Sequence, residues 1–466
     1  MKGIALAAAA AVLAVGPGYA GTKLIAGYIS EEPGLQRTIE KAGFSISCDR
    51  ESATYRCGET ATFSILPVFP DGTVITGVTV KVRLDNFGDF IVAPESRFEM
   101  ASTNAIVLKG TLLKPGFLRV RASMALVAGD GNKKKDVSRS WAVAYEPQKI
   151  RPGTPDVRDF DAFWSNAVAK LERETPLDMK CRKVEELSQG DKDFYVFDFN
   201  TACGRRLNGS MTVPKKLKAP YPVRVRLPGA GCGAGANRIT TLMPFDDALC
   251  MMVYPFDWPQ AITGALDEVQ AKYDGFWEDC VKKYGVPWYC AGISVSREEF
   301  FYYSVILGAN RAVEWLRSPE SGFPVDKENF VYAGASQGGG LGLALVYLNG
   351  HFRKAFFGVT GISDMLGFNH QARQCGWPAI VMAHDPEHRA AVASRIRYFD
   401  GVNFARRLKL PVWFTAGYGD TACPPAAVWA TYNACASKDK HISGMIGVGH
   451  SISPEAQKEI EEWIKK

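Results

Sequence analysis

Apolar and polar residues alternate in short runs from Phe44 to Tyr145. The clearest runs are Thr60–Leu66, Val78–Leu84 and Phe117–Ala122, and clusters of Gly, Asp and Pro separate them. Alternation of this kind gives a β-strand one buried face and one exposed face. Strands at this spacing predict an immunoglobulin-like β-sandwich of about a hundred residues, which we assign to residues 21–146.

The pattern changes after a proline-rich linker at residues 147–155. Apolar residues in Phe301–Leu316 recur every three or four positions, as on one face of a helix. Short apolar runs such as Phe330–Ala333 and Pro411–Thr415 alternate with helical patterns. Strands that alternate with helices predict a mostly parallel sheet covered on both faces. Residues 156–466 are therefore predicted to form an α/β domain.

The first twenty residues resemble a targeting segment. Lys2 precedes an apolar run from Ile4 to Val15, and a short Gly- and Pro-containing segment ends at Ala20. This order is typical of a secretory signal peptide, and the run is too short to span a bilayer. We therefore expect cleavage after Ala20, export to a bacterial periplasm or exterior, and no membrane span.

Composition and charge exclude several classes of protein. Hydrophobic residues make up 47% and charged residues 22% of the 466 residues, which excludes a disordered, collagen-like or coiled-coil chain. The net charge of +6 is small and scattered, so a nucleic-acid partner is not expected.

Eleven cysteines in an exported chain predict disulfides. The candidate pairs are close in sequence: Cys48 with Cys57, Cys181 with Cys203, and Cys280 with Cys290. The zinc-binding spacings C-x-x-C and H-E-x-x-H do not occur, so neither a metal nor another cofactor is expected.

The pentapeptide Gly334–Gly338 has the form G-x-S-x-G, with Ser336 at its centre. It follows the predicted strand Phe330–Ala333 and precedes the helical pattern Leu341–Leu348, the context of a nucleophile elbow. Its glycines permit a strained turn that lifts the serine hydroxyl above the sheet. We predict Ser336 as the nucleophile; an ordinary glycine-rich turn is the alternative.

A serine hydroxyl needs an adjacent base to act as a nucleophile. Of six histidines, His450 is best placed, because it follows the predicted strand Met445–Val448 and precedes the predicted helix Pro454–Ile464. His370, on a loop after another predicted strand, is the alternative base.

The chain order of an α/β-hydrolase places the acid between the serine and the histidine. Asp420 follows the predicted strand Pro411–Thr415, and Asp364 follows the strand before it. We expect Asp420 to orient His450 and to stabilise its imidazolium form, with Asp364 as the alternative.

Two backbone N–H groups are expected to stabilise the oxyanion of the reaction. One belongs to Gln337, directly after the predicted nucleophile. The other belongs to Ala230, in a glycine-rich turn after the predicted strand Val223–Leu227. A turn without function is the alternative for Ala230.

Residues 232–296 form a long connection that is rich in aromatic side chains. Rings in such a segment more often pack the segment itself; Trp258, Trp277 and Trp288 are nevertheless candidates for a substrate wall, because indole rings stack on sugars. We expect this segment to be an insertion that covers the site as a lid.

Five longer stretches carry a further signal: DFDAFW at 159–164, ANRAVEWLRS at 309–318, GASQGGGLGLAL at 334–345, RYFDGVNFARRLKLPVW at 397–413 and GDTACPPAAVWATYN at 419–433. Together they resemble the acetyl xylan esterase/cephalosporin C deacetylase family, carbohydrate esterase family seven. The resemblance implies an α/β-hydrolase fold and a triad of Ser336, Asp420 and His450. It also implies Gln337 as an oxyanion donor, release of acetate from acetylated sugars without a metal, and frequent homo-oligomers.

The chain departs from this family at three places. Pro228–Ala230 stands where the family usually has His-Gly-Tyr, and Tyr254–Trp258 replaces an Arg-Gly-Gln-Gly segment. Ser451 follows the histidine where Glu is common. The chemistry should survive because the oxyanion donors are backbone groups, but loss of a pocket ring alters the expected substrate preference.

These observations predict a secreted serine esterase that removes acetyl groups from carbohydrate. An esterase for feruloyl or glucuronoyl groups, or a peptidase, would use the same triad. A non-catalytic carbohydrate-binding protein is a third alternative, although such a protein would not need all three triad residues.

Overall fold

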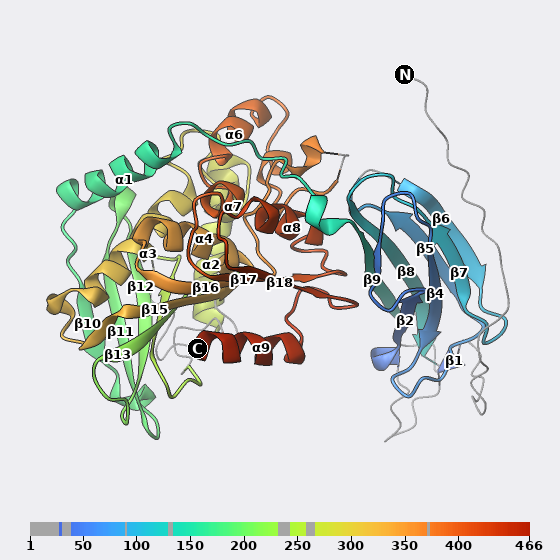
Figure 1. Cartoon of the computed structure of the whole chain (residues 1–466), viewed down its shortest axis with the longest axis horizontal. Coiled ribbons are helices and arrows are strands. Elements are labelled where there is room, and N and C mark those ends of the chain that lie inside the picture. Colours follow the sequence, from blue (N-terminus) through green and yellow to red (C-terminus); the bar gives the residue numbers. More distant parts are fainter. Residues whose placement is uncertain are drawn as a thin grey trace.

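The computed structural model describes residues 28–29, 39–88, 91–128, 134–231, 243–257, 266–370 and 373–466. It places an N-terminal β region beside a larger α/β unit (Figure 1). The linker between them contains a short 3-10 turn, Pro147–Lys149.

The N-terminal region is a sandwich of two sheets. One sheet has the order β3-β9-β8-β5-β6, with β1 paired to β8, and the other has the order β2-β4-β7. Phe63 from β4 and Leu118 from β8 are fully buried in the core that the two sheets share. The three strands predicted from alternation are confirmed. The strand bounds are β1 (Tyr28–Ile29), β2 (Gly43–Cys48), β3 (Thr54–Tyr55), β4 (Ala61–Val68), β5 (Thr79–Asp85), β6 (Ile91–Glu99), β7 (Ile106–Gly110), β8 (Gly116–Ala128) and β9 (Lys134–Tyr145).

The α/β unit is built on a nine-stranded sheet of order β10-β11-β12-β14-β13-β15-β16-β17-β18. The pairs from β10 to β14 are antiparallel, and those from β14 to β18 are parallel. The prediction of a mostly parallel sheet is therefore confirmed. The strand bounds are β10 (Lys180–Lys183), β11 (Lys192–Asn200), β12 (Arg206–Pro214), β13 (Tyr221–Arg226), β14 (Leu249–Tyr254), β15 (Val325–Ala335), β16 (Phe352–Gly358), β17 (Val412–Gly417) and β18 (Lys440–Met445).

Helices cover both faces of this sheet (Figure 1). On one face, α9 buries Ile460 and Ile464 against Phe356. On the other face, α3 and α4 bury apolar side chains against Phe357. The helix bounds are α1 (Phe160–Glu174), α2 (Leu266–Tyr284), α3 (Phe301–Arg317), α4 (Gln337–Asn349), α5 (Ile380–Ala383), α6 (Arg389–Ile396), α7 (Gly401–Ala405), α8 (Pro425–Ala434) and α9 (Pro454–Lys465).

Two sequence predictions about the sheet were wrong. Residues 232–296 are not an insertion outside the fold, because they contain β14, which pairs with both β12 and β13. All six β14 side chains are buried, so no alternation marks the strand. The last strand lies at Lys440–Met445 rather than at Met445–Val448. As an edge strand it can be short and polar, which hides it from a search for apolar runs.

The predicted disulfides do not form in the structure. Every cysteine among the described residues is a free thiol. The Cys48 thiol donates to the carbonyl of Arg50 and the Cys203 thiol to that of Glu298, so these side chains point to other partners.

No helix among the described residues is long and apolar enough to cross a membrane. The predicted signal peptide, residues 1–20, lies outside the described residues.

Candidate active site

The predicted catalytic residues all follow strands of the parallel part of the large sheet. Ala230 follows β13, Ser336 follows β15, Asp420 follows β17 and His450 follows β18. Parallel strands end at the same edge of a sheet, and in α/β folds this edge holds the ligand site. The topology therefore gathers these four residues on one edge.

Ser336 occupies a strained turn between the end of β15 and the start of α4. Its φ of 57° and ψ of −127° are unusual for a non-glycine residue. Its backbone is held on both sides, because its N–H donates to Gly358 O at 2.9 Å and its carbonyl accepts from Gly361 N at 2.9 Å. Gly338 allows the close approach, since a Cβ there would collide with the carbonyl oxygen of Leu227. The predicted nucleophile elbow is thus present.

A chain of hydrogen bonds connects the three predicted triad side chains. His450 Nε2 lies 2.9 Å from Ser336 Oγ, and His450 Nδ1 lies 2.8 Å from Asp420 Oδ2. Because a carboxylate only accepts, Nδ1 carries the proton and Nε2 accepts from the serine hydroxyl. The structure therefore brings the three residues together in the order that proton transfer requires.

Asp420 is fully buried and held in a single orientation. Its Oδ1 accepts from the backbone N–H groups of Ala422 and Cys423, at 2.8 and 2.9 Å, which leaves Oδ2 for His450. Burial raises the pKa of the neighbouring Cys423 thiol, and the nearby Asp420 charge acts in the same direction. Cys423 therefore remains a neutral thiol beside Ser336 and does not compete with it as an ionised nucleophile.

The first N–H groups of a helix have no acceptor within that helix, and the helix dipole favours negative charge at this end. Gln337 is the first residue of α4, so its N–H is free for an oxyanion. Its side-chain Nε2 donates to the carbonyls of Pro228 and Gly229, both at 3.4 Å. The turn that carries Ala230, which is exposed, is thereby attached to the elbow.

Tyr302 is a positioning residue that the sequence analysis missed. It lies on α3, and its hydroxyl donates to Gln337 Oε1 at 2.7 Å. Burial raises the pKa of Tyr302 well above its ordinary value, so the hydroxyl remains a donor. In sequence this tyrosine is one more large side chain in a helical apolar pattern, and nothing distinguishes it from core packing.

The described residues give no support to the candidate aromatic wall. Trp258 lies outside the described residues. Trp288 is fully buried and its Nε1 donates to Tyr273 at 3.0 Å, so its assignment as a substrate wall was wrong. Trp277 is half-buried, with its ring 5.3 Å from that of Tyr289. These rings pack the segment itself, as rings in such a segment more often do.

A different tryptophan, Trp377, lies next to the nucleophile. The Gly361 amide contacts Ser336, and a Cβ on Gly361 would lie 3.1 Å from the Trp377 ring. Trp377 is half-buried, and its ring centroid lies 5.2 Å from that of Tyr289 in a tilted arrangement. It lies outside the aromatic segment that attracted attention in the sequence, and no local motif marks it.

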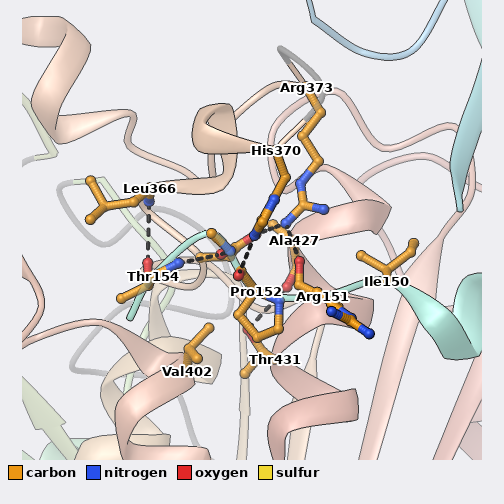
Figure 2. A network of polar contacts seen from close by, with 12 residues as sticks. Ile150, Arg151, Pro152, Thr154, Leu366, His370, Arg373, Val402, Ala427 and Thr431 are labelled. Atoms are coloured by element: carbon orange, nitrogen blue, oxygen red, sulfur yellow. Dashed lines mark hydrogen bonds and ion pairs between the residues drawn. The ribbon is translucent and has the colours of Figure 1, made fainter. Parts of the chain in front are cut away.

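The two alternative triad residues serve the linker instead (Figure 2). His370 Nε2 lies 3.0 Å from the carbonyl oxygen of Pro152. Asp364 Oδ1 accepts from the N–H of Gly153 at 2.6 Å, and Arg373 bridges Asp364 to the carbonyl of Arg151. Neither alternative contacts Ser336 in the described part of the chain. Among the same residues, no cluster of His, Cys, Asp and Glu side chains could hold a metal ion.

The sheet, the strained elbow and the Ser336–His450–Asp420 contacts define an α/β-hydrolase. The family model described as acetyl xylan esterase (AXE1) matches residues 144–466. The chain belongs to this family and is a carboxylic ester hydrolase.

Individual relatives agree with the family. The acetyl esterase Axe7A of Xylanibacter ruminicola is 27% identical over 394 residues, a match that covers 83% of each chain. An acetyl xylan esterase from Paenibacillus sp. R4 superposes with a TM-score of 0.55 at 24% identity, over 69% of this chain and 98% of its own. Acetyl xylan esterase 1 from Thermoanaerobacterium sp. gives a TM-score of 0.53 at 19% identity, over 68% and 96%. The two structures establish the fold.

Proposed function

We propose that this protein is a secreted serine esterase that removes O-acetyl groups from carbohydrate. The hydrogen-bonded path from Asp420 through His450 to Ser336 is the observation that carries the proposal. The match to the acetyl xylan esterase family supports acetyl as the acyl group and a sugar as the alcohol part of the substrate.

The reaction follows from the positions of these groups. His450 Nε2 takes the proton of Ser336 as Oγ attacks the ester carbonyl carbon, and the oxyanion that forms accepts from backbone N–H groups of Gln337 and Ala230. His450 then gives its proton to the sugar oxygen as the carbon–oxygen bond breaks. Water, deprotonated by the same nitrogen, then attacks the acyl carbon, and the proton returns to Ser336 Oγ as its bond to that carbon breaks and acetate leaves. Asp420 stabilises the imidazolium in both halves.

We expect acetyl esters to be preferred over butyryl esters by about tenfold or more in kcat/KM. An acetyl group needs only a small space beside Ser336, while the small side chain of Ala230 leaves more room than the tyrosine usual in the family, which keeps the preference moderate. Initial rates on p-nitrophenyl esters of increasing chain length measure this ratio. A preference for butyryl or longer esters would contradict the proposal.

Acetate release from acetylated xylan oligosaccharides tests the sugar directly. Feruloyl and glucuronoyl esters and peptide anilides are the matched comparisons, because each would use the same triad with a different acyl group. We expect the enzyme to turn over acetylated sugars faster than feruloyl esters, glucuronoyl esters or peptide anilides. Binding of the oligosaccharide without acetate release would instead support a non-catalytic binding protein.

Export is part of the same proposal. An apolar run of a dozen residues after Lys2, ended by small residues at Ala20, supports cleavage at that position. Expression in a Gram-negative host is expected to yield periplasmic protein with the intact mass of a chain that begins at Gly21. Recovery of the full-length chain from the cytoplasm alone would contradict export.

A further inference from the structure

The outer face of the β9-β8-β5 sheet lies against the α/β unit near the ends of β17 and β18 (Figure 1). At one end of this face the contact is apolar. Phe117 and Ala142 pack on Tyr418 and Ala426, with the rings of Phe117 and Tyr418 5.0 Å apart. The sandwich is thus seated directly on the loop that carries Asp420.

Beside this apolar contact the two units enclose a cavity of about 640 Å³. Ligand sites commonly have volumes of roughly 300–1,000 Å³. Thr421, the neighbour of the catalytic Asp420, lines the cavity from the α/β side. Ser140 lines it from the sandwich side, and its carbonyl lies 2.6 Å from the position of a Cβ on Gly419. The cavity therefore borders the active-site loops.

The lining of this cavity is strongly cationic. Five basic side chains face a single lining carboxylate, that of Glu95. The basic residues are Lys81 and Arg83 from β5, Arg119 and Arg121 from β8, and Arg139 from β9.

Only part of this charge is neutralised within the sandwich. The buried Asp85 carboxylate binds Arg83 and Arg119 at 2.7–3.0 Å. The register places Arg121 directly opposite Arg83, and like charges in this position are destabilising. In the described part of the chain, the Arg121 side chain makes no hydrogen bond or ion pair, and burial together with Arg119 and Arg83 lowers its pKa.

Arg139 also lacks a carboxylate partner in the described part of the chain. It donates to the backbone carbonyl oxygens of Phe44, at 2.7 Å, and Gly447, at 3.5 Å. Gly447 lies three residues before His450, so the guanidinium is held between the sandwich and the histidine loop. An anion in the cavity would compensate both Arg121 and Arg139.

The space continues away from the active site. A second cavity of about 820 Å³ shares Lys81, Ser123 and Ser138 with the first and extends along β8 and β9 to Ala125 and Asp136. Residues of the sandwich alone line this second cavity. A continuous space of this extent, which begins beside the loop of Asp420, fits a chain of sugars.

We propose that this cationic cavity binds the carboxylate of a uronic acid residue of the glycan, so that the preferred substrate is an acetylated acidic polysaccharide. Guanidinium groups bind carboxylates through paired, charge-assisted hydrogen bonds. The inference rests on the proposed deacetylase function and names the class of glycan for that site.

The test compares two substrates in the full-length enzyme. One is an acetylated xylo-oligosaccharide preparation that carries glucuronic acid, and the other is the same preparation after enzymatic removal of the glucuronic acid. The wild type is expected to favour the acidic preparation by about tenfold in kcat/KM, an effect that falls with added salt. The variants are Arg121→Gln alone and together with Arg139→Gln. Lys109→Gln, an equal charge loss on the exposed part of β7 in the opposite sheet, is the matched control.

Arg121→Gln is expected to raise KM for the acidic preparation about tenfold. Rates on the neutral preparation and on p-nitrophenyl acetate should remain within about twofold, and the melting temperature should be unchanged or higher, because a like-charge pair is removed. Lys109→Gln should match the wild type on every substrate.

Equal kcat/KM of the wild type on both preparations would overturn the inference and leave the deacetylase function intact. A parallel loss on acidic and neutral substrates in Arg121→Gln would overturn it as well, since it would indicate a structural role. No acetate from either preparation would defeat the proposed function itself.

Discussion

Replacing Ser336 with alanine is expected to lower kcat for p-nitrophenyl acetate by about 10⁴-fold or more. The substitution removes the only atom that forms the acyl-enzyme, while the glycines of the elbow and the backbone bonds to Gly358 and Gly361 remain. Initial rates measure the loss, and the melting temperature shows that the fold is kept.

Ser451→Ala is the matched control for this experiment, because Ser451 carries an exposed hydroxyl and directly follows His450. It should retain full activity. Residual activity of the Ser336→Ala variant within tenfold of the wild type would refute the assignment of the nucleophile.

His450→Ala is expected to lower kcat by about 10³-fold or more, because the serine then has no base and the leaving oxygen has no acid. His370→Ala should keep its activity. His370 contacts Pro152 rather than the triad, so its loss should cost about 1 kcal/mol of unfolding free energy at most.

Both variants are measured with the same acetyl ester and by thermal unfolding. An inactive His370 variant with an active His450 variant would show that His370, and not His450, is the base. Loss of activity in both with unchanged stability would indicate that His370 also takes part in proton transfer, beyond the His450 contacts with Ser336 and Asp420.

Much of the fold could be predicted because its strands have simple patterns. Alternation identified β4, β5 and β8, each with one face in the sandwich core. The strand β14 escaped because both of its faces are buried, so its six residues show no period. The strand β18 escaped for the opposite reason, since its edge position allows polar residues such as Lys440 and His441.

The candidate site was predictable to the extent that local sequence determines it. Ser336, Asp420 and His450 each directly follow a strand or its end loop, and chain order ranked them. Tyr302 and Trp377 reach the elbow through tertiary packing, which no local motif encodes. The same limit applies to the cationic cavity, because the opposition of Arg121 and Arg83 depends on strand register.

Trp288 and the cysteines show where composition misleads. An aromatic-rich segment suggested a sugar wall, but Trp288 is fully buried against Tyr273. Short cysteine separations suggested bridges, but the thiols of Cys48 and Cys203 bond to backbone carbonyls. In both cases the sequence shows which side chains are present, but only the fold determines where they point.

The linker has a consequence for anyone who recombines this enzyme with other modules. The Thr154 hydroxyl donates to Asp400 at 2.6 Å, and the Gly153 amide donates to Asp364. Both carboxylates are fully buried. Burial, as the larger cause, and the nearby Asp364 charge raise the pKa of Asp400 to about 6. Gly153 and Thr154 thus donate hydrogen bonds to buried carboxylates of the hydrolase, although their sequence is typical of a linker. A chimera joined at residue 155 would remove linker donors from both buried carboxylates, so a fusion point at or before Pro147 preserves the catalytic half as a portable unit.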